Sequence, residues 1–203
     1  MSKEIQLHGG TITSFVDYNE LLENFTCGNA DMDVFLKEKA VGLTNSSETG
    51  TSGFFNDEDE LVGFYSLSAA KIEIQNGYDS KTFANLSESA AYLASNVSYP
   101  AIKLDFFAVN EKHQRKHYGS AMLKRIFVGL YLTQMIANVG FVALILDATP
   151  EAVEFYEQLG FEYLHRDLEK DSRILDTYPM FIRMDTIKAI AEFIGVPDDP
   201  YNY

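Results

Sequence analysis

A polar segment near the middle of the chain has residue types that could bind an anion. Residues 109–121 read Val-Asn-Glu-Lys-His-Gln-Arg-Lys-His-Tyr-Gly-Ser-Ala and join an apolar stretch to a long amphipathic one. Where a strand leads into a helix, the first backbone N–H groups of the helix lack partners and the helix dipole is positive. Arg115 and Lys116 add full charges there. The segment fits a pyrophosphate cradle, and it fits equally an exposed basic turn that caps a helix.

A second segment combines an aromatic pair with a helix-ending glycine. Residues 152–161 read Ala-Val-Glu-Phe-Tyr-Glu-Gln-Leu-Gly-Phe, which predicts a short amphipathic helix that ends at Gly160. Thr149 is a suitable N-cap, and Pro150 suits the first helical position. Phe155 and Tyr156 should face inward. On helical spacing alone, Tyr156 is most simply a core residue.

Hydrophobic periodicity predicts the elements that position these segments. We expect two helices within Phe15–Leu43, a loop over 45–53, and a hairpin with strands at 54–55 and 61–70. A helix over 86–94 is expected in an otherwise irregular region. The remaining expected elements are a buried strand (101–109), a long helix (119–137), a parallel strand (141–146) and closing strands (161–164 and 180–184).

Composition limits the class of protein. The 203 residues suggest a single domain over 1–190 followed by an acidic tail over 191–203. A net charge of −14 argues against nucleic acid and anionic membranes as general partners. Cys27 is the only cysteine, so no intrachain disulfide forms, and no histidine spacing predicts a metal site. Without an apolar run of membrane-spanning length or a signal peptide, we expect a cytoplasmic protein.

The order of these motifs resembles the GNAT N-acetyltransferase family. The resemblance rests on the strand ending in Ala-Val, the basic Gln-x-x-x-x-Gly turn, the long helix, the apolar strand and Phe-Tyr-Glu-x-x-Gly-Phe. It extends over about residues 15–185. Phe25-x-Cys-Gly and the strand that begins at Val62 resemble the branch that includes acetyltransferase toxins of toxin–antitoxin modules. The implied fold is α/β (α+β), with a mixed central sheet splayed at the cofactor site and flanked by helices.

The resemblance also implies roles for individual residues. Acetyl-CoA would be the acetyl donor, and Tyr156 would be the general acid that protonates the departing thiolate. The general base is open between Asp105 and Glu73, each of which could equally be a solvated or salt-bridged acid. The implied cofactor-binding residues are Phe107, Ala108, Val109, Gln114, Arg115, Lys116, His117, Tyr118, Gly119, Ser120, Thr149 and Phe155.

Two residues depart from the family pattern. His117 stands where the turn usually has its first glycine, so it could shift the cradle, weaken cofactor affinity or contact phosphate itself. Thr149 lies near the position where many relatives have an asparagine that touches the cofactor. Its capping role would explain it without any part in catalysis.

The acceptor cannot be identified from these motifs. The first hypothesis is acetylation of a primary amine of a small molecule or protein. The second is toxin-like acetylation of aminoacyl-tRNA, which the acidic charge disfavours. The third, motivated by His117, is a GNAT-fold binding or regulatory protein without catalysis. A homodimer and an antitoxin partner are left open.

Overall fold

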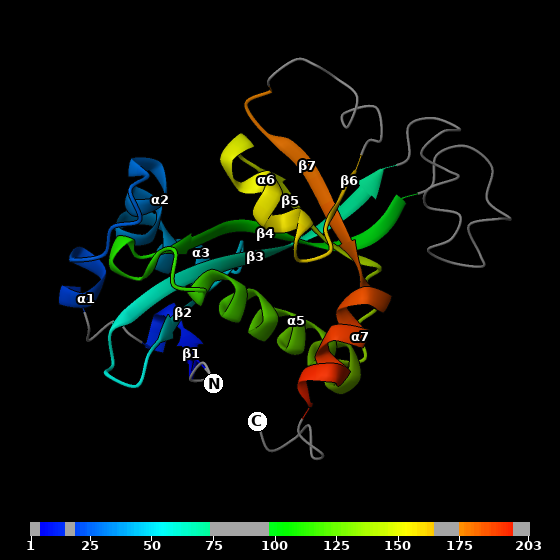
Figure 1. The fold of residues 1–203 in the computed structure, drawn as a ribbon, viewed down its shortest axis with the longest axis horizontal. Coiled ribbons are helices and arrows are strands. Elements are labelled where there is room, and N and C mark those ends of the chain that lie inside the picture. Colours follow the sequence, from blue (N-terminus) through cyan, green and yellow to red (C-terminus); the bar gives the residue numbers. More distant parts are fainter. Residues whose placement is uncertain (1–4, 15–18, 74–97, 165–174, 197–203) are drawn as a thin grey trace, which may run out of the picture. The chain divides into compact units, whose positions relative to one another are not determined.

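The computed structural model of the chain describes residues 5–14, 19–73, 98–164 and 175–196 (Figure 1). The expected helix over 86–94 lies outside this part. The elements up to the second long strand are β1 (His8–Thr11), α1 (Asn19–Glu23), α2 (Ala30–Val34), η2 (Phe35–Lys39), α3 (Ala40–Asn45), β2 (Gly50–Phe55), β3 (Leu61–Glu73) and β4 (Ser98–Val109). After it come η4 (Glu111–His113), α5 (Tyr118–Ala137), β5 (Ala143–Ala148), η5 (Pro150–Ala152), α6 (Val153–Glu157), β6 (Glu162–Tyr163), β7 (Tyr178–Arg183) and α7 (Met184–Ile194).

The fold class is mixed α/β, as predicted. In the described part of the chain the strands form a seven-stranded mixed sheet in the order β1-β2-β3-β4-β5-β7-β6. The chain divides into two compact units, one comprising 1–68 and 104–126 and the other 69–103 and 127–203. β3, β4 and α5 each contribute residues to both units.

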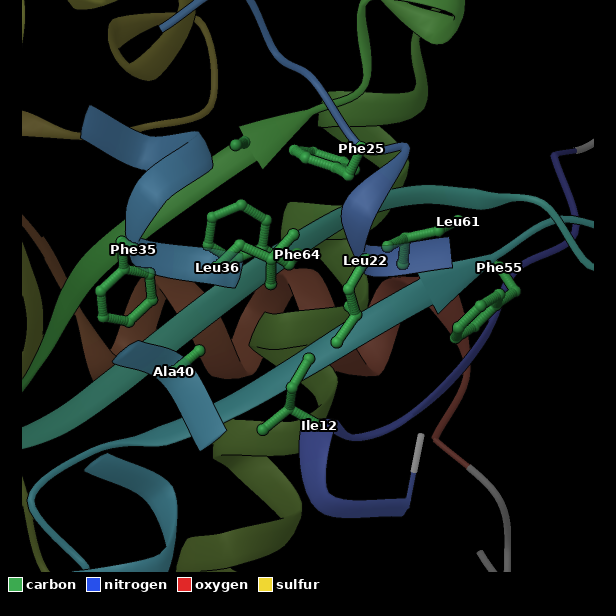
Figure 2. Packing of buried hydrophobic residues seen from close by; sticks show 10 residues of the cluster. Ile12, Leu22, Phe25, Phe35, Leu36, Ala40, Phe55, Leu61 and Phe64 are labelled. Atoms are coloured by element: carbon green, nitrogen blue, oxygen red, sulfur yellow. The ribbon is translucent and has the colours of Figure 1, made fainter. Parts of the chain in front are cut away.

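An antiparallel meander and the N-terminal helices form the first unit. β1 pairs with β2, and β2 pairs with β3. Phe64 of β3 is fully buried, with its ring centroid 5.5 Å from that of Phe25 and 6.0 Å from that of Phe35. Figure 2 shows these rings among the other buried apolar side chains of the cluster. Burying this apolar surface is the main stabilising term for the unit.

The N-terminal helices follow the sequence pattern in most respects. Asn29 caps α2, since its side-chain Oδ1 accepts from the backbone N–H groups of Asp31 and Met32. The segment 27–29 therefore separates α1 from α2 within the range where two helices were expected. The helix then continues through a π-helical segment, Phe35–Lys39, which periodicity does not predict.

The expected loop over residues 45–53 is too long. β2 begins at Gly50, so the last residues of that stretch are a strand. Thr51 lies opposite Ser66 of β3, and its buried hydroxyl donates to the Ser66 hydroxyl at 3.1 Å. Cross-strand pairing of the polar groups therefore overrides the loop-like Ser, Thr and Gly composition.

The second unit contains the parallel pair and the closing strands. β4 pairs in parallel with β5 through Ala101–Lys103 and Ala143–Ile145, and β7 pairs antiparallel with β5 and β6. Phe161 connects two helices of this unit. Its ring centroid lies 6.2 Å from Phe127 of α5 and 5.3 Å from Tyr156 of α6.

The prediction for the end of the chain needs correction. The strand expected over 180–184 is β7, which ends at Arg183, and Met184 begins α7, a helix that the sequence analysis did not anticipate. Met184, Ile187 and Ala191 are buried, so α7 reaches into the segment expected to be an acidic tail. Among the described residues, no helix is both long and apolar enough to cross a membrane.

Candidate active site

The turn that leads into α5 is built on local hydrogen bonds. Asn110, buried at the end of β4, accepts from the Lys112 backbone N–H through its side-chain Oδ1 at 3.1 Å. Its carbonyl accepts from the backbone N–H groups of His113 at 2.8 Å and Gln114 at 3.1 Å. These bonds form η4, and the chain then continues through Arg115 and His117 into α5.

Arg115 and His117 both occupy the left-handed region, with φ of 58° and 66°. The position where the family has glycine therefore keeps the conformation for which glycine is favoured, although its residue is histidine. For a residue with a Cβ this conformation costs roughly 1–2 kcal/mol. Strain of this kind persists where surrounding contacts fix the backbone.

The turn ends at the N-terminus of the long helix. The His117 carbonyl accepts from the Ala121 N–H at 3.1 Å, as a helix-starting residue does. Tyr118, Gly119 and Ser120 occupy the first turn of α5 and are half-buried. First-turn N–H groups have no partner within their own helix, so this is where an anion is stabilised by backbone donors and the helix dipole.

Exposed basic side chains precede this helix start. Arg115, Lys116 and His117 are exposed, and the Lys116 ammonium donates to the Lys112 carbonyl at 2.7 Å. No acidic side chain in the described ranges pairs with the Arg115 guanidinium. The residues present therefore fit a diphosphate in charge and in backbone donors.

Gln114 differs from its neighbours, because its side chain points back into the protein. Its amide Nε2 donates to the carbonyls of Cys27 at 2.8 Å and Val109 at 3.0 Å. The Glu111 N–H also donates to the Thr26 carbonyl at 2.9 Å. The loop between α1 and α2 thus supports the turn, and the Gln114 side chain is a brace in this structure.

The strand before the turn lies unusually close to its neighbours. Gly63 of β3 packs so tightly that an added Cβ would meet the Ala108 carbonyl and lie 2.7 Å from the Met122 Cε atom of α5. Glycine is required at this close approach. Phe107, Ala108 and Val109, the predicted pantetheine-binding residues, therefore lie on a strand that β3 holds closely.

The two candidate bases have different surroundings. One carboxylate oxygen of Asp105 on β4 is shielded from solvent, and no described group donates a hydrogen bond to it. Glu73 is fully exposed, and its carboxylate lies 2.6 Å from the Lys71 ammonium. The Lys71 hydrogen bond and charge lower the pKa of Glu73, which makes it a weaker base.

Tyr156, the candidate acid, belongs to the second unit. It is buried on α6 with 7% of its surface exposed, and its ring packs edge-on against Phe155 and Phe161. Burial raises its pKa above the ordinary value of 10.0, so the phenol keeps its proton at neutral pH. The helix ends at Glu157, earlier than the predicted end at Gly160, and Gly160 lies in the turn that follows with a φ of +93°.

Thr149 does not act as expected. It lies in extended backbone before Pro150, at the N-cap position, but its side chain makes no capping hydrogen bond. The expected capping role is therefore wrong for its hydroxyl. The segment Pro150–Ala152 is a short 3₁₀ helix, and Pro150 supplies no N–H that would need a cap.

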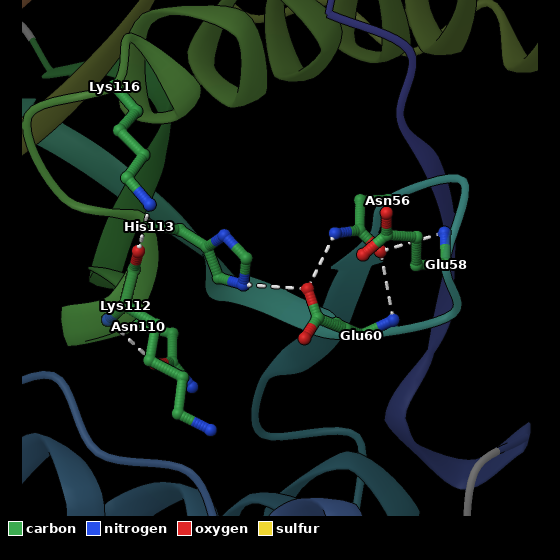
Figure 3. A network of polar contacts seen from close by, with 7 residues as sticks. All are labelled: Asn56, Glu58, Glu60, Asn110, Lys112, His113 and Lys116. Atoms are coloured by element: carbon green, nitrogen blue, oxygen red, sulfur yellow. Dashed lines mark hydrogen bonds and ion pairs between the residues drawn. The ribbon is translucent and has the colours of Figure 1, made fainter.

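A buried polar network beside the turn was missed by the sequence analysis (Figure 3). His113 is 8% exposed, and its Nε2 lies 3.4 Å from Oε2 of Glu60 in the β2–β3 turn. The same oxygen accepts from Asn56 Nδ2 at 2.9 Å. Residues 56–60 were expected only as the turn of the hairpin, and a signal lay in Asn56, since asparagine at a turn start often bonds its own backbone.

The remaining chemical candidate is Cys27. It packs against the core cluster of the first unit, and burial raises the pKa of its thiol from 9.0 to about 11. It is thus a thiol at neutral pH and a poor nucleophile. No group of three or more metal-ligating side chains lies together within the described ranges.

Solved structures of similar fold include bacterial toxins, alone or in complex with an antitoxin, acetyl-CoA or tRNA. A bacterial toxin has a TM-score of 0.71 at 20% identity, covering 93% of this chain and 97% of that one. A tyrosine-to-phenylalanine mutant of AtaT, bound to the C-terminus of the antitoxin AtaR and acetyl-CoA, has a TM-score of 0.67 at 19% identity, covering 91% and 97%. AtaT complexed with acetyl-methionyl-tRNAfMet has a TM-score of 0.69 at 18% identity, covering 91% and 99%.

These likenesses confirm the predicted GNAT fold. The family model for the GNAT acetyltransferase domain matches residues 51–163, from β2 through α5 and α6 to β6. This range includes the basic turn and Tyr156, and it is more than half of the chain. The chain belongs to the GNAT acetyltransferase family, enzymes that take their acetyl group from acetyl-CoA.

Proposed function

We propose that the chain transfers the acetyl group of acetyl-CoA to a primary amine of a small molecule or protein, with residues 114–120 as its diphosphate site. The observation that carries this proposal is the turn itself. Arg115 and His117, both in the left-handed region, precede the first turn of α5, where backbone N–H groups have no partner within the helix, and Arg115 and Lys116 are exposed. In a chain of net charge −14, this concentration of positive charge is well suited to an anionic cofactor.

Bound acetyl-CoA supplies an activated thioester. On the protein side, the amine must lose a proton, and the leaving thiolate must gain one. Asp105 is the better placed base, because its shielded oxygen has no described donor and could accept an ammonium proton. Tyr156 keeps its proton at neutral pH because it is buried, which suits a general acid.

The first experiment separates binding from transfer. We expect calorimetry to detect coenzyme A binding to the wild-type chain, and replacing Arg115 and Lys116 with methionine to weaken it. We expect Tyr156→Phe to lower kcat by ~10²–10⁴-fold while the Kd of acetyl-CoA stays within about twofold. Tyr131→Phe is the matched control, because it removes a phenol that donates to Glu192 on the protein surface. Equal rates for Tyr156→Phe and wild type would refute the acid role.

The choice of base can be tested in the same assay. We expect Asp105→Asn to lower kcat, because the proton acceptor is gone. Glu73→Gln should leave kcat unchanged, since the Glu73 carboxylate is exposed and paired with Lys71. The reverse pattern would assign the base to Glu73.

Aminoacyl-tRNA is the second candidate acceptor. The observation that favours it is the similarity to AtaT complexed with acetyl-methionyl-tRNAfMet, which covers 91% of this chain. The net charge of −14 opposes capture of a polyanion. Labelled acetyl-CoA offered with polyamines, lysine peptides or charged tRNA would decide between them. Label appearing only in charged tRNA would replace the first proposal with the second.

A further inference from the structure

A pair of side chains, His113 and Glu60, joins the basic turn to the turn between β2 and β3. His113 Nε2 lies 3.4 Å from Glu60 Oε2 (Figure 3). His113 is 8% exposed, and its ring packs edge-on against Tyr118, the first residue of α5, with centroids 5.2 Å apart. The His113 side chain therefore lies between Glu60 and the start of the helix.

The Glu60 carboxylate has a second partner besides His113. Asn56 Nδ2 donates to the same carboxylate oxygen at 2.9 Å. Asn56 is itself buried, and its Oδ1 accepts from the backbone N–H groups of Glu58 and Glu60, both at 3.0 Å. A carboxylate anchored in this way has few rotamers left to lose when it contacts His113.

Buried polar residues concentrate in this network. The buried polar residues of the described part are Thr51, Asn56, Ser66, Asn110 and His113. Asn56 and His113 both contact Glu60 and so link the β2–β3 turn to the basic turn. Asn110 accepts from the Lys112 N–H within the basic turn, and Thr51 and Ser66 pair with each other. Hydrogen bonds constrain the orientation of their partners, whereas apolar contacts do not. The polar contacts therefore specify the position of the basic turn.

We propose that Glu60 is a positioning residue for cofactor binding, acting through His113 on the left-handed turn before α5. The proposal rests on the proposed diphosphate site at this turn. Arg115 and His117 hold a strained conformation there, and strained backbone needs contacts that fix it. Glu60 supplies one such contact without touching the cofactor itself.

The test compares two acidic residues of the same turn. Glu60→Ala and Glu58→Ala each remove one negative charge, but only Glu60 contacts His113 through its side chain. Charge removal alone would tighten coenzyme A binding equally in both. We expect Glu60→Ala to weaken coenzyme A binding by about two- to fivefold, as a half-exposed contact between a carboxylate and an imidazole allows, with kcat at saturating acetyl-CoA unchanged. Glu58→Ala should not weaken binding.

Further variants separate positioning from stability. We expect His113→Leu, which keeps the apolar bulk, to weaken binding as Glu60→Ala does, and the double variant to be no weaker than either single one. His113→Gln keeps a donor and should restore most of the affinity. A lower Tm with an unchanged Kd at 25 °C would show that Glu60 is structural only and would overturn the proposal.

The same measurements distinguish a failure of the positioning role of Glu60 from a failure of the diphosphate site. If replacing Arg115 and Lys116 weakens coenzyme A binding while Glu60→Ala does not, only the positioning proposal fails. If the wild-type chain binds no coenzyme A at millimolar concentration, the diphosphate site itself fails.

Discussion

Replacing His117 with glycine tests whether the departure from the family pattern damages the turn. His117 has a φ of 66° and is exposed, so the substitution removes little buried surface. Removing the Cβ from a residue in the left-handed region raises the unfolding free energy by roughly 1–2 kcal/mol. Glycine also has more conformational freedom in the unfolded chain, which lowers the unfolding free energy by ~0.4–1 kcal/mol. The net expectation for His117→Gly is a gain in unfolding free energy of about 0–1.6 kcal/mol, with a central value of about 0.8 kcal/mol.

For a chain of this size, such a gain raises Tm by roughly 1–4 °C. Calorimetric unfolding gives the shift, and Lys116→Gly, at a neighbouring position without positive φ, is the control that should be destabilised. Because the backbone already has the conformation that glycine favours, the Kd of coenzyme A should stay within about twofold. A fall in Tm for His117→Gly would refute the strain argument. A large loss of affinity would show that the imidazole itself contacts phosphate.

Three further expectations follow from the described contacts. Gly63→Ala should destabilise the fold by ~1–3 kcal/mol in chemical denaturation, because its Cβ would collide with the Ala108 carbonyl; Gly129→Ala, in an open helical position, should stabilise instead. Cys27 should react with iodoacetamide at neutral pH about a hundredfold more slowly than an ordinary thiol, because its pKa of about 11 lowers the thiolate fraction; a rate equal to that of a free thiol would contradict the burial argument. The raised pKa of Tyr156 means that the unfolded chain ionises first, so stability from this group is full below pH 10 and falls above it; thermal unfolding of Tyr156→Phe should therefore lose less stability between pH 9 and 11 than the wild type.

The sequence predicted those elements whose local signals and tertiary contacts agree. α5 was predicted to within one residue at its start, because its apolar stripe is wide and Gly119 follows a polar turn. Helices were expected within Phe15–Leu43, and Asn29 caps one of those that the structure has there. β4 was recognised because both of its faces are apolar, as suits an internal strand.

Other elements depend on contacts with residues that are distant in the sequence. β2 extends over Gly50–Phe55 because Thr51 finds Ser66 on the neighbouring strand, a pairing that composition does not reveal. The π-helical segment Phe35–Lys39 likewise has no signal in periodicity, and it places the Phe35 ring 3.6 Å from that of Phe106 on β4. α7 could have been found, since its buried residues Met184, Ile187 and Ala191 have helical spacing.

The candidate site shows where a motif and its physical meaning separate. The family's glycine is a requirement for positive φ, and His117 meets that requirement with a different side chain. By sequence alone the glycine is missing, but the structure retains the positive φ at this position. It also has contacts that support the turn and are not part of the family pattern. The Gln114 amide donates to two carbonyls, Asn110 caps the turn, and Glu60 contacts His113.

If these contacts hold the strained backbone at His117, their removal should weaken coenzyme A binding more in the wild type than in a His117→Gly background. The same Glu60→Ala substitution, measured in both backgrounds by coenzyme A calorimetry, makes that argument testable. Equal losses in both would show that the supports and the strained residue act independently.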